Sequence, residues 1–193
     1  MFSSSKTKCV STFVLILFVV STLFAGAAKS PVRAKKGMVV SSHYLASQAG
    51  LDILKKGGNA VDAAVATGLA LAVVNPAAGN IGGGGFMIVV TKEGEATAFD
   101  FREKAPGLAH ERMYVDSLGN YAKYLNHEGY LAVGVPGTVA GFDLALKRFG
   151  KKSWKELAAP AVRLAENGFP LSWSMAEDFK GLKNELKPYP GSM

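Results

Sequence analysis

The sequence predicts a mixed α+β fold made of several helices and one β-hairpin. Two helical segments rich in small apolar residues come first, two short strands joined by a glycine turn follow, and helices with capping signals fill the C-terminal half. The chain has 193 residues, of which 49% are hydrophobic and 19% are charged, so it can bury a core. A single hairpin does not make a stable sheet, so we expect further strands to be needed to complete the fold.

The N-terminal segment predicts a secretory signal peptide over residues 1–27. Two lysines precede an apolar core at 13–24, and the sequence AGA at 25–27 fits the small-residue pattern of a cleavage site. The apolar run is shorter than the roughly 20 residues that span a membrane, so cleavage is favoured over an uncleaved signal anchor. We therefore expect export to the periplasm or the cell exterior, with residues 28–36 as a linker and residues 37–193 as the folded part.

Cysteine usage and charge narrow the function classes. Cys9 is the only cysteine and lies in the segment that we expect to be removed, so the mature chain would have no disulfide, thiolate metal site or cysteine nucleophile. The formal net charge is +7, but the basic residues are spread along the chain, which indicates a solvated surface rather than a nucleic-acid site. His43, His110 and His127 lack metal-ligand spacing, so we expect no metal.

Two helices are predicted in the segment that follows the linker. Apolar residues recur at helical spacing in SSHYLASQAGLDILKKGG, where Ser41 or Ser42 can cap the start and Gly57 suits the left-handed position after the end. Asn59 then caps AVDAAVATGLALAVVNP, which ends at Pro76. The second helix is apolar nearly all round, so it should be buried.

A glycine run leads into the predicted hairpin. Gly82–Gly85 precede the strand FMIVVT, and Gly94 supplies the turn to the strand ATAFDF. The first strand is a continuous apolar run, which predicts that both of its faces are covered. The glycines do not fit a phosphate-binding loop, because no Gly-Lys-Ser/Thr sequence follows and the order is helix, glycines, strand. We interpret them as a tight turn at which backbone segments approach closely.

Three further helices are predicted towards the C-terminus. The segment VPGTVAGFDLALKRFG predicts a helix capped by Thr138 and closed at Gly150. The next helix opens with a capping box of Ser153 and Glu156, and Pro160 is expected to kink or divide it. The last helix, SMAEDFKGLKNEL, is expected to begin with a second Ser-x-x-Glu capping pattern.

The charged segment DFREKAP is the main candidate for a functional site. Arg102 follows the second strand and could present its planar guanidinium to a carboxylate. Composition alone favours an ordinary charged loop over that role. The sequence has no G-x-S-x-G motif, and Thr138 is interpreted as a helix cap, so no side chain stands out as a nucleophile.

Four stretches together resemble the N-terminal part of the large subunit of gamma-glutamyltranspeptidases. They are GGNAVDAA, GNIGGGGF, DFRE and PGTVAGF, and the resemblance extends over about residues 37–187. It implies an N-terminal-nucleophile hydrolase with an αββα sandwich, of which this chain would form an incomplete part. It also implies a precursor that cleaves itself, after which the N-terminal Thr of the small subunit attacks the gamma-glutamyl amide of glutathione. Water or an acceptor amino acid then resolves the acyl-enzyme, and no metal or organic cofactor is needed.

The resemblance implies one substrate contact in this chain. Arg102 matches the arginine that holds the alpha-carboxylate of the gamma-glutamyl group. The Thr-Thr-His stretch at the start of the family's small subunit does not occur in these residues, so we expect the chain alone to be inactive. The expected partners are glutathione, other gamma-glutamyl compounds and the small subunit of the same precursor. A related acylase for beta-lactam side chains and a non-catalytic secreted remnant are the alternatives.

Overall fold

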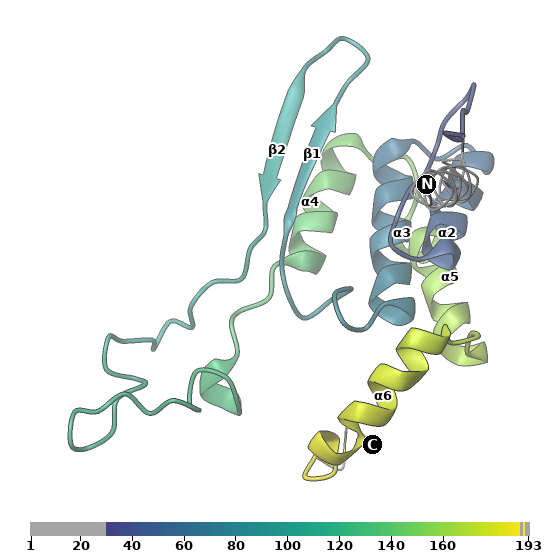
Figure 1. Ribbon diagram of the computed structural model, residues 1–193. Coiled ribbons are helices and arrows are strands. Elements are labelled where there is room, and N and C mark those ends of the chain that lie inside the picture. Colours follow the sequence, from purple (N-terminus) through teal and green to yellow (C-terminus); the bar gives the residue numbers. More distant parts are fainter. Residues whose placement is uncertain (1–29, 190, 192–193) are drawn as a thin grey trace, which may run out of the picture. The chain divides into compact units, whose positions relative to one another are not determined.

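The structure is a computed structural model that describes residues 30–189 and residue 191. The predicted signal peptide lies outside these residues. In the described part, the order is α2 (Tyr44–Lys55), α3 (Ala60–Val74), β1 (Phe86–Val90), β2 (Ala96–Asp100), the 3-10 helix η1 (Tyr130–Ala132), α4 (Thr138–Phe149), α5 (Trp154–Asn167) and α6 (Trp173–Leu186) (Figure 1). The mixed α+β class is therefore confirmed. None of the helices described in residues 30–189 has both the length and the apolar character of a membrane span.

Helix α3 forms the centre of the core, as its continuous apolar sequence predicts. It packs against α2 and α5 and also contacts α4, which lies on the other side of α3 in Figure 1. Val65 of α3 and Leu157 of α5 are fully buried in the same cluster as Phe142 of α4. Gly68 lets α4 approach, because a Cβ at this position would lie 2.7 Å from the ring of Phe142. Small residues in α3 thus allow close helix packing.

The start of α2 differs from the sequence prediction. His43, rather than a serine, is the N-cap, and its Nδ1 accepts from the backbone N–H two residues later at 3.3 Å. The serine hydroxyls are used elsewhere: Ser41 donates to the carbonyl of His43, and Ser42 accepts from the side-chain amide of Asn75. Gly57 has a φ of 84°, as predicted for the left-handed position after the helix.

The predicted cap of α3 is confirmed. Asn59 Oδ1 accepts from the backbone N–H groups of Val61 and Asp62, both at 3.0 Å. Asp62 returns the interaction by accepting from the N–H of Asn59, which completes a capping box. The helix ends at Val74, just before the predicted stop at Pro76.

The hairpin is confirmed, but the prediction that both faces of β1 are covered is wrong for this structure. The strands pair antiparallel, with Phe86 opposite Asp100, and Gly94 forms the turn with a φ of 89°. Three apolar side chains of β1 are 65%, 73% and 64% exposed, namely those of Phe86, Ile88 and Val90. The alternate residues pack towards α4 and the core. The outer face is open because the described residues supply only these two strands and no layer over it.

Helix α4 ends at Gly150 as predicted, but Thr138 does not cap its start. Gly137 is the N-cap, and no side chain caps the helix there. Thr138 is the first helical residue, and its hydroxyl donates instead to Asn80 at 2.6 Å. The prediction failed because the partner of this hydroxyl lies 58 residues away and not in the adjacent turn.

The last two helices confirm one predicted cap and correct another. The capping box of Ser153 and Glu156 opens α5, which continues through Pro160 and is not divided by it. Pro160 is buried, and packing of this apolar face offsets the lost backbone hydrogen bond. Helix α6 begins two residues earlier than predicted, because Ser172 rather than Ser174 caps it.

Candidate functional site

The glycine run lies directly against the segment that carries Arg102. Gly85 and Phe101 exchange backbone hydrogen bonds of 3.3 and 3.0 Å, which extend the hairpin beyond the ends of β1 and β2. A Cβ on Gly84 would lie 2.6 Å from the carbonyl oxygen of Phe101 and 2.8 Å from the Cα of Arg102. No other residue type fits this position without a backbone shift, so the predicted close approach is confirmed at Gly84.

The start of α4 contacts both the glycine run and the segment that carries Arg102. The carbonyl of Gly83 accepts from the N–H groups of Gly137 at 2.8 Å and Thr138 at 3.0 Å. A Cβ on Gly137 would overlap the carbonyl oxygen of Phe101, and one on Gly141 would overlap the ring of Phe101. The glycines of PGTVAGF therefore let the first turn of α4 pack on the backbone that leads to Arg102.

A third contact holds the chain beyond Arg102. Lys104 and Val135 form an isolated antiparallel bridge, with backbone hydrogen bonds of 3.1 and 2.8 Å. Residues 80–85, 100–104 and 134–138 are thus joined to one another, and we call this arrangement the Arg102 junction. It brings together GNIGGGGF, DFRE and PGTVAGF, which are far apart in the sequence.

The Arg102 backbone is fixed at the junction, while its side chain is exposed. Its N–H donates to Asp100 Oδ1 at 3.0 Å. Its Nε lies 3.3 Å from Glu103 Oε2, and its Cζ lies 5.9 Å from the centroid of the Phe86 ring. The Arg102 side chain is 64% exposed, so the pair with Glu103 is weak and the guanidinium can exchange this carboxylate for another.

A cavity of about 420 Å³ lies beside Arg102. Its charged side chains come from residues 102–104, directly after β2. Most of its apolar side chains come from residues 105–133, further along the irregular connection to α4. The lining residues are Arg102, Glu103, Lys104, Ala105, Pro106, Ala109, Met113, Tyr114, Ala132, Val133 and Gly134. The hydroxyl of Tyr114 donates to the carbonyl of Leu131 at 3.1 Å, which joins two parts of this connection. Two cations beside an open cavity can bind a small ligand that carries a carboxylate.

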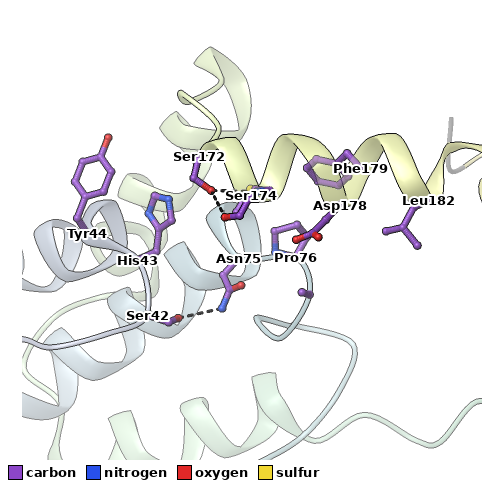
Figure 2. Close-up of a pocket in the computed structure, with 12 residues that line it drawn as sticks. Ser42, His43, Tyr44, Asn75, Pro76, Ser172, Ser174, Asp178, Phe179 and Leu182 are labelled. Atoms are coloured by element: carbon purple, nitrogen blue, oxygen red, sulfur yellow. Dashed lines mark hydrogen bonds between the residues drawn. The ribbon is translucent and has the colours of Figure 1, made fainter.

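A second cavity, of about 470 Å³, lies between the start of α2, the end of α3 and α6 (Figure 2). Serine, histidine and aspartate line it, but they do not form a catalytic triad. His43 Nδ1 caps α2, and in the described part of the chain no hydrogen bond joins the His43 imidazole to a serine hydroxyl or to Asp178. Figure 2 shows the hydroxyls of Ser172 and Ser174 bonded to each other, at 3.1 Å.

The sequence pointed to Arg102 alone, but the structure places other polar side chains at the same junction. Glu103 lies beside the Arg102 guanidinium, while Asn80 and Thr138 join the glycine turn to α4. Asn80 precedes the glycine run and Thr138 lies in PGTVAGF, so the motifs contained both residues without indicating that they meet. In residues 30–189 and 191, no group of three or more His, Cys, Asp or Glu side chains could hold a metal ion.

Sequence comparisons relate most of the chain to one family. Residues 46–193 match the family model described as gamma-glutamyltranspeptidase. The glutathione hydrolase proenzyme of Pseudomonas sp. (strain A14) is 51% identical over 161 residues, which cover 80% of this chain and 28% of the relative. The proenzyme of Escherichia coli K12 is 51% identical over 158 residues, which cover 82% of this chain and 27% of the relative. The chain therefore spans little more than a quarter of the length of these relatives.

Solved structures give the same relationship. The Helicobacter pylori gamma-glutamyltranspeptidase matches with a TM-score of 0.80 and 50% identity, over 84% of this chain and 47% of that chain. The cephalosporin acylase from Bacillus halodurans matches with a TM-score of 0.70 and 36% identity, over 84% of this chain and 31% of that chain.

Proposed function

Because the chain belongs to the gamma-glutamyltranspeptidase family, we propose that it acts as the N-terminal part of a glutathione hydrolase proenzyme. In this proposal, the precursor cleaves itself, and the new N-terminal threonine of the small subunit attacks the carbonyl carbon of a gamma-glutamyl amide. The amine leaves, and the resulting acyl-enzyme transfers the gamma-glutamyl group to water or to an acceptor amino acid. The two relatives from Pseudomonas sp. and Escherichia coli are glutathione hydrolase proenzymes, which supports glutathione as the donor.

The observation that carries this proposal is the setting of Arg102. Its backbone is held between the glycine turn and the start of α4, while its guanidinium is exposed beside a cavity of about 420 Å³. An arginine fixed in this way can bind a carboxylate through two charge-assisted hydrogen bonds. We propose that Arg102 binds the alpha-carboxylate of the donor and so places the gamma-amide in front of the nucleophile.

The open outer face of the hairpin supports the rest of the architecture. We propose that β1 and β2 form part of an αββα sandwich, in which a further layer supplied by the complete proenzyme covers Phe86, Ile88 and Val90. The 193-residue chain alone should neither cleave itself nor release glutamate from glutathione. We also propose that the protein is exported after removal of residues 1–27, and N-terminal sequencing of exported protein should find a start near residue 28.

A hybrid proenzyme tests the proposal. Residues 28–193 of this chain, which retain all of α2 and its N-cap His43, are joined to the part of the Pseudomonas sp. relative that follows its matching segment. The hybrid should split into two subunits and release glutamate from glutathione, and alanine in place of the nucleophilic threonine should abolish both activities. A hybrid that folds but has neither activity would favour the non-catalytic remnant.

A second candidate is a side-chain acylase. The Bacillus halodurans cephalosporin acylase matches with 36% identity and a TM-score of 0.70, so the same fold accommodates that activity in a relative. The assay is therefore repeated with a cephalosporin in place of glutathione. Turnover of the cephalosporin, with no effect of an Arg102→Lys substitution, would favour the acylase over the glutathione hydrolase.

A further inference from the structure

We propose that Asn80 and Thr138 are positioning residues for Arg102, and that they act through the glycine turn. This inference rests on the proposed function, because it assumes that Arg102 binds the alpha-carboxylate of the donor. It assigns a role in substrate binding to two side chains that do not line the cavity beside Arg102.

Asn80 and Thr138 close a ring of hydrogen bonds. Asn80 Oδ1 accepts from the N–H of Gly83 at 3.0 Å and from the hydroxyl of Thr138 at 2.6 Å. The carbonyl of Gly83 then accepts from the N–H groups of Gly137 and Thr138. Thr138 is only 3% exposed, so water does not compete well for its hydroxyl. The ring therefore sets the distance between the glycine turn and the first turn of α4.

The backbone of Arg102 lies between the glycine turn and the first turn of α4, whose separation this ring of hydrogen bonds sets. The position of a Cβ on Gly84 is 2.8 Å from the Cα of Arg102, and that of a Cβ on Gly137 is 3.2 Å from the carbonyl oxygen of Arg102. The backbone of Arg102 is thus in contact with the glycine turn on one side and with the start of α4 on the other. A change in this separation must move Arg102, because neither glycine has a side chain that could adjust.

The use of the Thr138 hydroxyl distinguishes this role from ordinary helix capping. Gly137 is the N-cap of α4, and no side chain satisfies the first N–H groups of the helix. The hydroxyl at the next position donates to Asn80 instead. The helix start therefore lacks a stabilising side-chain cap, while a side-chain link to the turn beside Arg102 is present.

Thr138→Val in the hybrid proenzyme is the main test, because it removes the hydroxyl and keeps the shape. We expect the KM for glutathione to rise about threefold to tenfold with little change in kcat, since a misplaced guanidinium weakens ground and transition states alike. Thr138→Ser keeps the hydroxyl and should restore the KM. Thr67→Val is the matched control, because the buried Thr67 hydroxyl donates to Ala63 within α3 at 2.7 Å and takes no part in the Arg102 junction.

Two further measurements separate positioning from general stability. A donor analogue without the alpha-carboxylate should show the same KM in the Thr138→Val variant as in the parent. In an Arg102→Lys background, Thr138→Val should raise the KM by less than about twofold, because the two changes affect one contact. If Thr138→Val lowers activity towards both donors equally, or behaves as Thr67→Val does, the inference is wrong.

Asn80 provides an independent pair of variants. Asn80→Leu removes the acceptor and should reproduce the KM effect, whereas Asn80→Asp keeps an acceptor oxygen and should preserve the parent KM. If Thr138→Val and Asn80→Leu both fail to fold, the two side chains are structural and the inference is overturned. If Arg102→Lys itself leaves the KM unchanged, the proposed function fails as well. If the KM for glutathione rises with Arg102→Lys but not with Thr138→Val or Asn80→Leu, only the positioning role is rejected and the proposed function stands.

Discussion

The buried carboxylate of Asp62 accepts a hydrogen bond from the backbone N–H of Lys151, 89 residues further along the chain, at 3.0 Å. It also accepts from the N–H groups of Lys152 at 3.1 Å and Asn59 at 2.8 Å. Asp62 is fully buried in the first turn of α3, where the helix dipole favours a negative charge. One side chain thus joins the start of the central helix to the connection between α4 and α5.

Asp62→Ala should destabilise the region around α3 and α5. The substitution removes charge-assisted hydrogen bonds and leaves backbone donors without a partner, at a cost of about 2–4 kcal/mol in local unfolding free energy. Hydrogen exchange of α3 and α5 amides in the hybrid proenzyme measures this change. Asp52→Ala is the control, because the hydrogen bond that the structure describes for the Asp52 side chain comes from Gln48 at the surface of α2. Equal exchange in the two variants would contradict the role assigned to Asp62.

The start of α5 should be sensitive to acid through Glu156. The backbone N–H of Ser153, then its hydroxyl and the ammonium of Lys152, lower the pKa of Glu156 to about 2 from an ordinary value of 4.5. Because the pKa is lowered in the folded state, this stabilisation is complete above about pH 4.5 and is lost as the pH falls towards 2.

Carbon NMR of the labelled Glu156 carboxyl measures this pKa directly. Hydrogen exchange in the first turn of α5 should accelerate between pH 4.5 and 2 in the parent, and less so in a Glu156→Gln variant. A pKa near 4.5 in the folded protein would show that the capping box does not bind the carboxylate as described.

The exposed face of β1 should behave differently in the isolated chain and in the complete proenzyme. Ile88 is 73% exposed, so the isolated chain should aggregate or unfold without cooperativity, and Ile88→Glu should raise its solubility. The same substitution should disrupt folding and self-cleavage of the hybrid, where we propose that a further layer covers this face. Leu118→Glu, at an 84% exposed position outside the hairpin, should have neither effect. A hybrid that tolerates Ile88→Glu would argue against the αββα sandwich.

The sequence predicted those structural features that are determined by residues adjacent in the chain, such as helix caps. The caps at Asn59 and Ser153 were predictable, because each side chain bonds to backbone within the next three residues. Thr138 was misassigned, because its partner Asn80 is brought near only by the folded chain. The exposure of β1 could not be predicted from its apolar sequence. That sequence indicates that both faces of the strand favour burial, but not which segment covers each face.

For the candidate site, too, the sequence predicted the local motifs but not the contacts between segments that are distant in the chain. The motif DFRE indicated Arg102, and the glycine run indicated a close backbone approach. The contact between Gly84 and the Arg102 backbone, and the ring that includes Asn80, required the structure. These contacts join segments that are distant in the sequence, and single-sequence patterns carry no information on such pairs.

The central claim is that Arg102 binds the alpha-carboxylate of a gamma-glutamyl donor, and kinetics of Arg102→Lys in the hybrid proenzyme test it most directly. A lysine cannot reproduce the two parallel hydrogen bonds of a guanidinium, so kcat/KM for glutathione should fall by about one to three decades. Self-cleavage should continue, because that reaction uses no free alpha-carboxylate, and a donor analogue without this group should be turned over as by the parent. If kcat/KM for glutathione stays within about twofold of the parent, a factor worth less than one hydrogen bond to a charged group, Arg102 is an ordinary charged loop residue and the central claim is wrong.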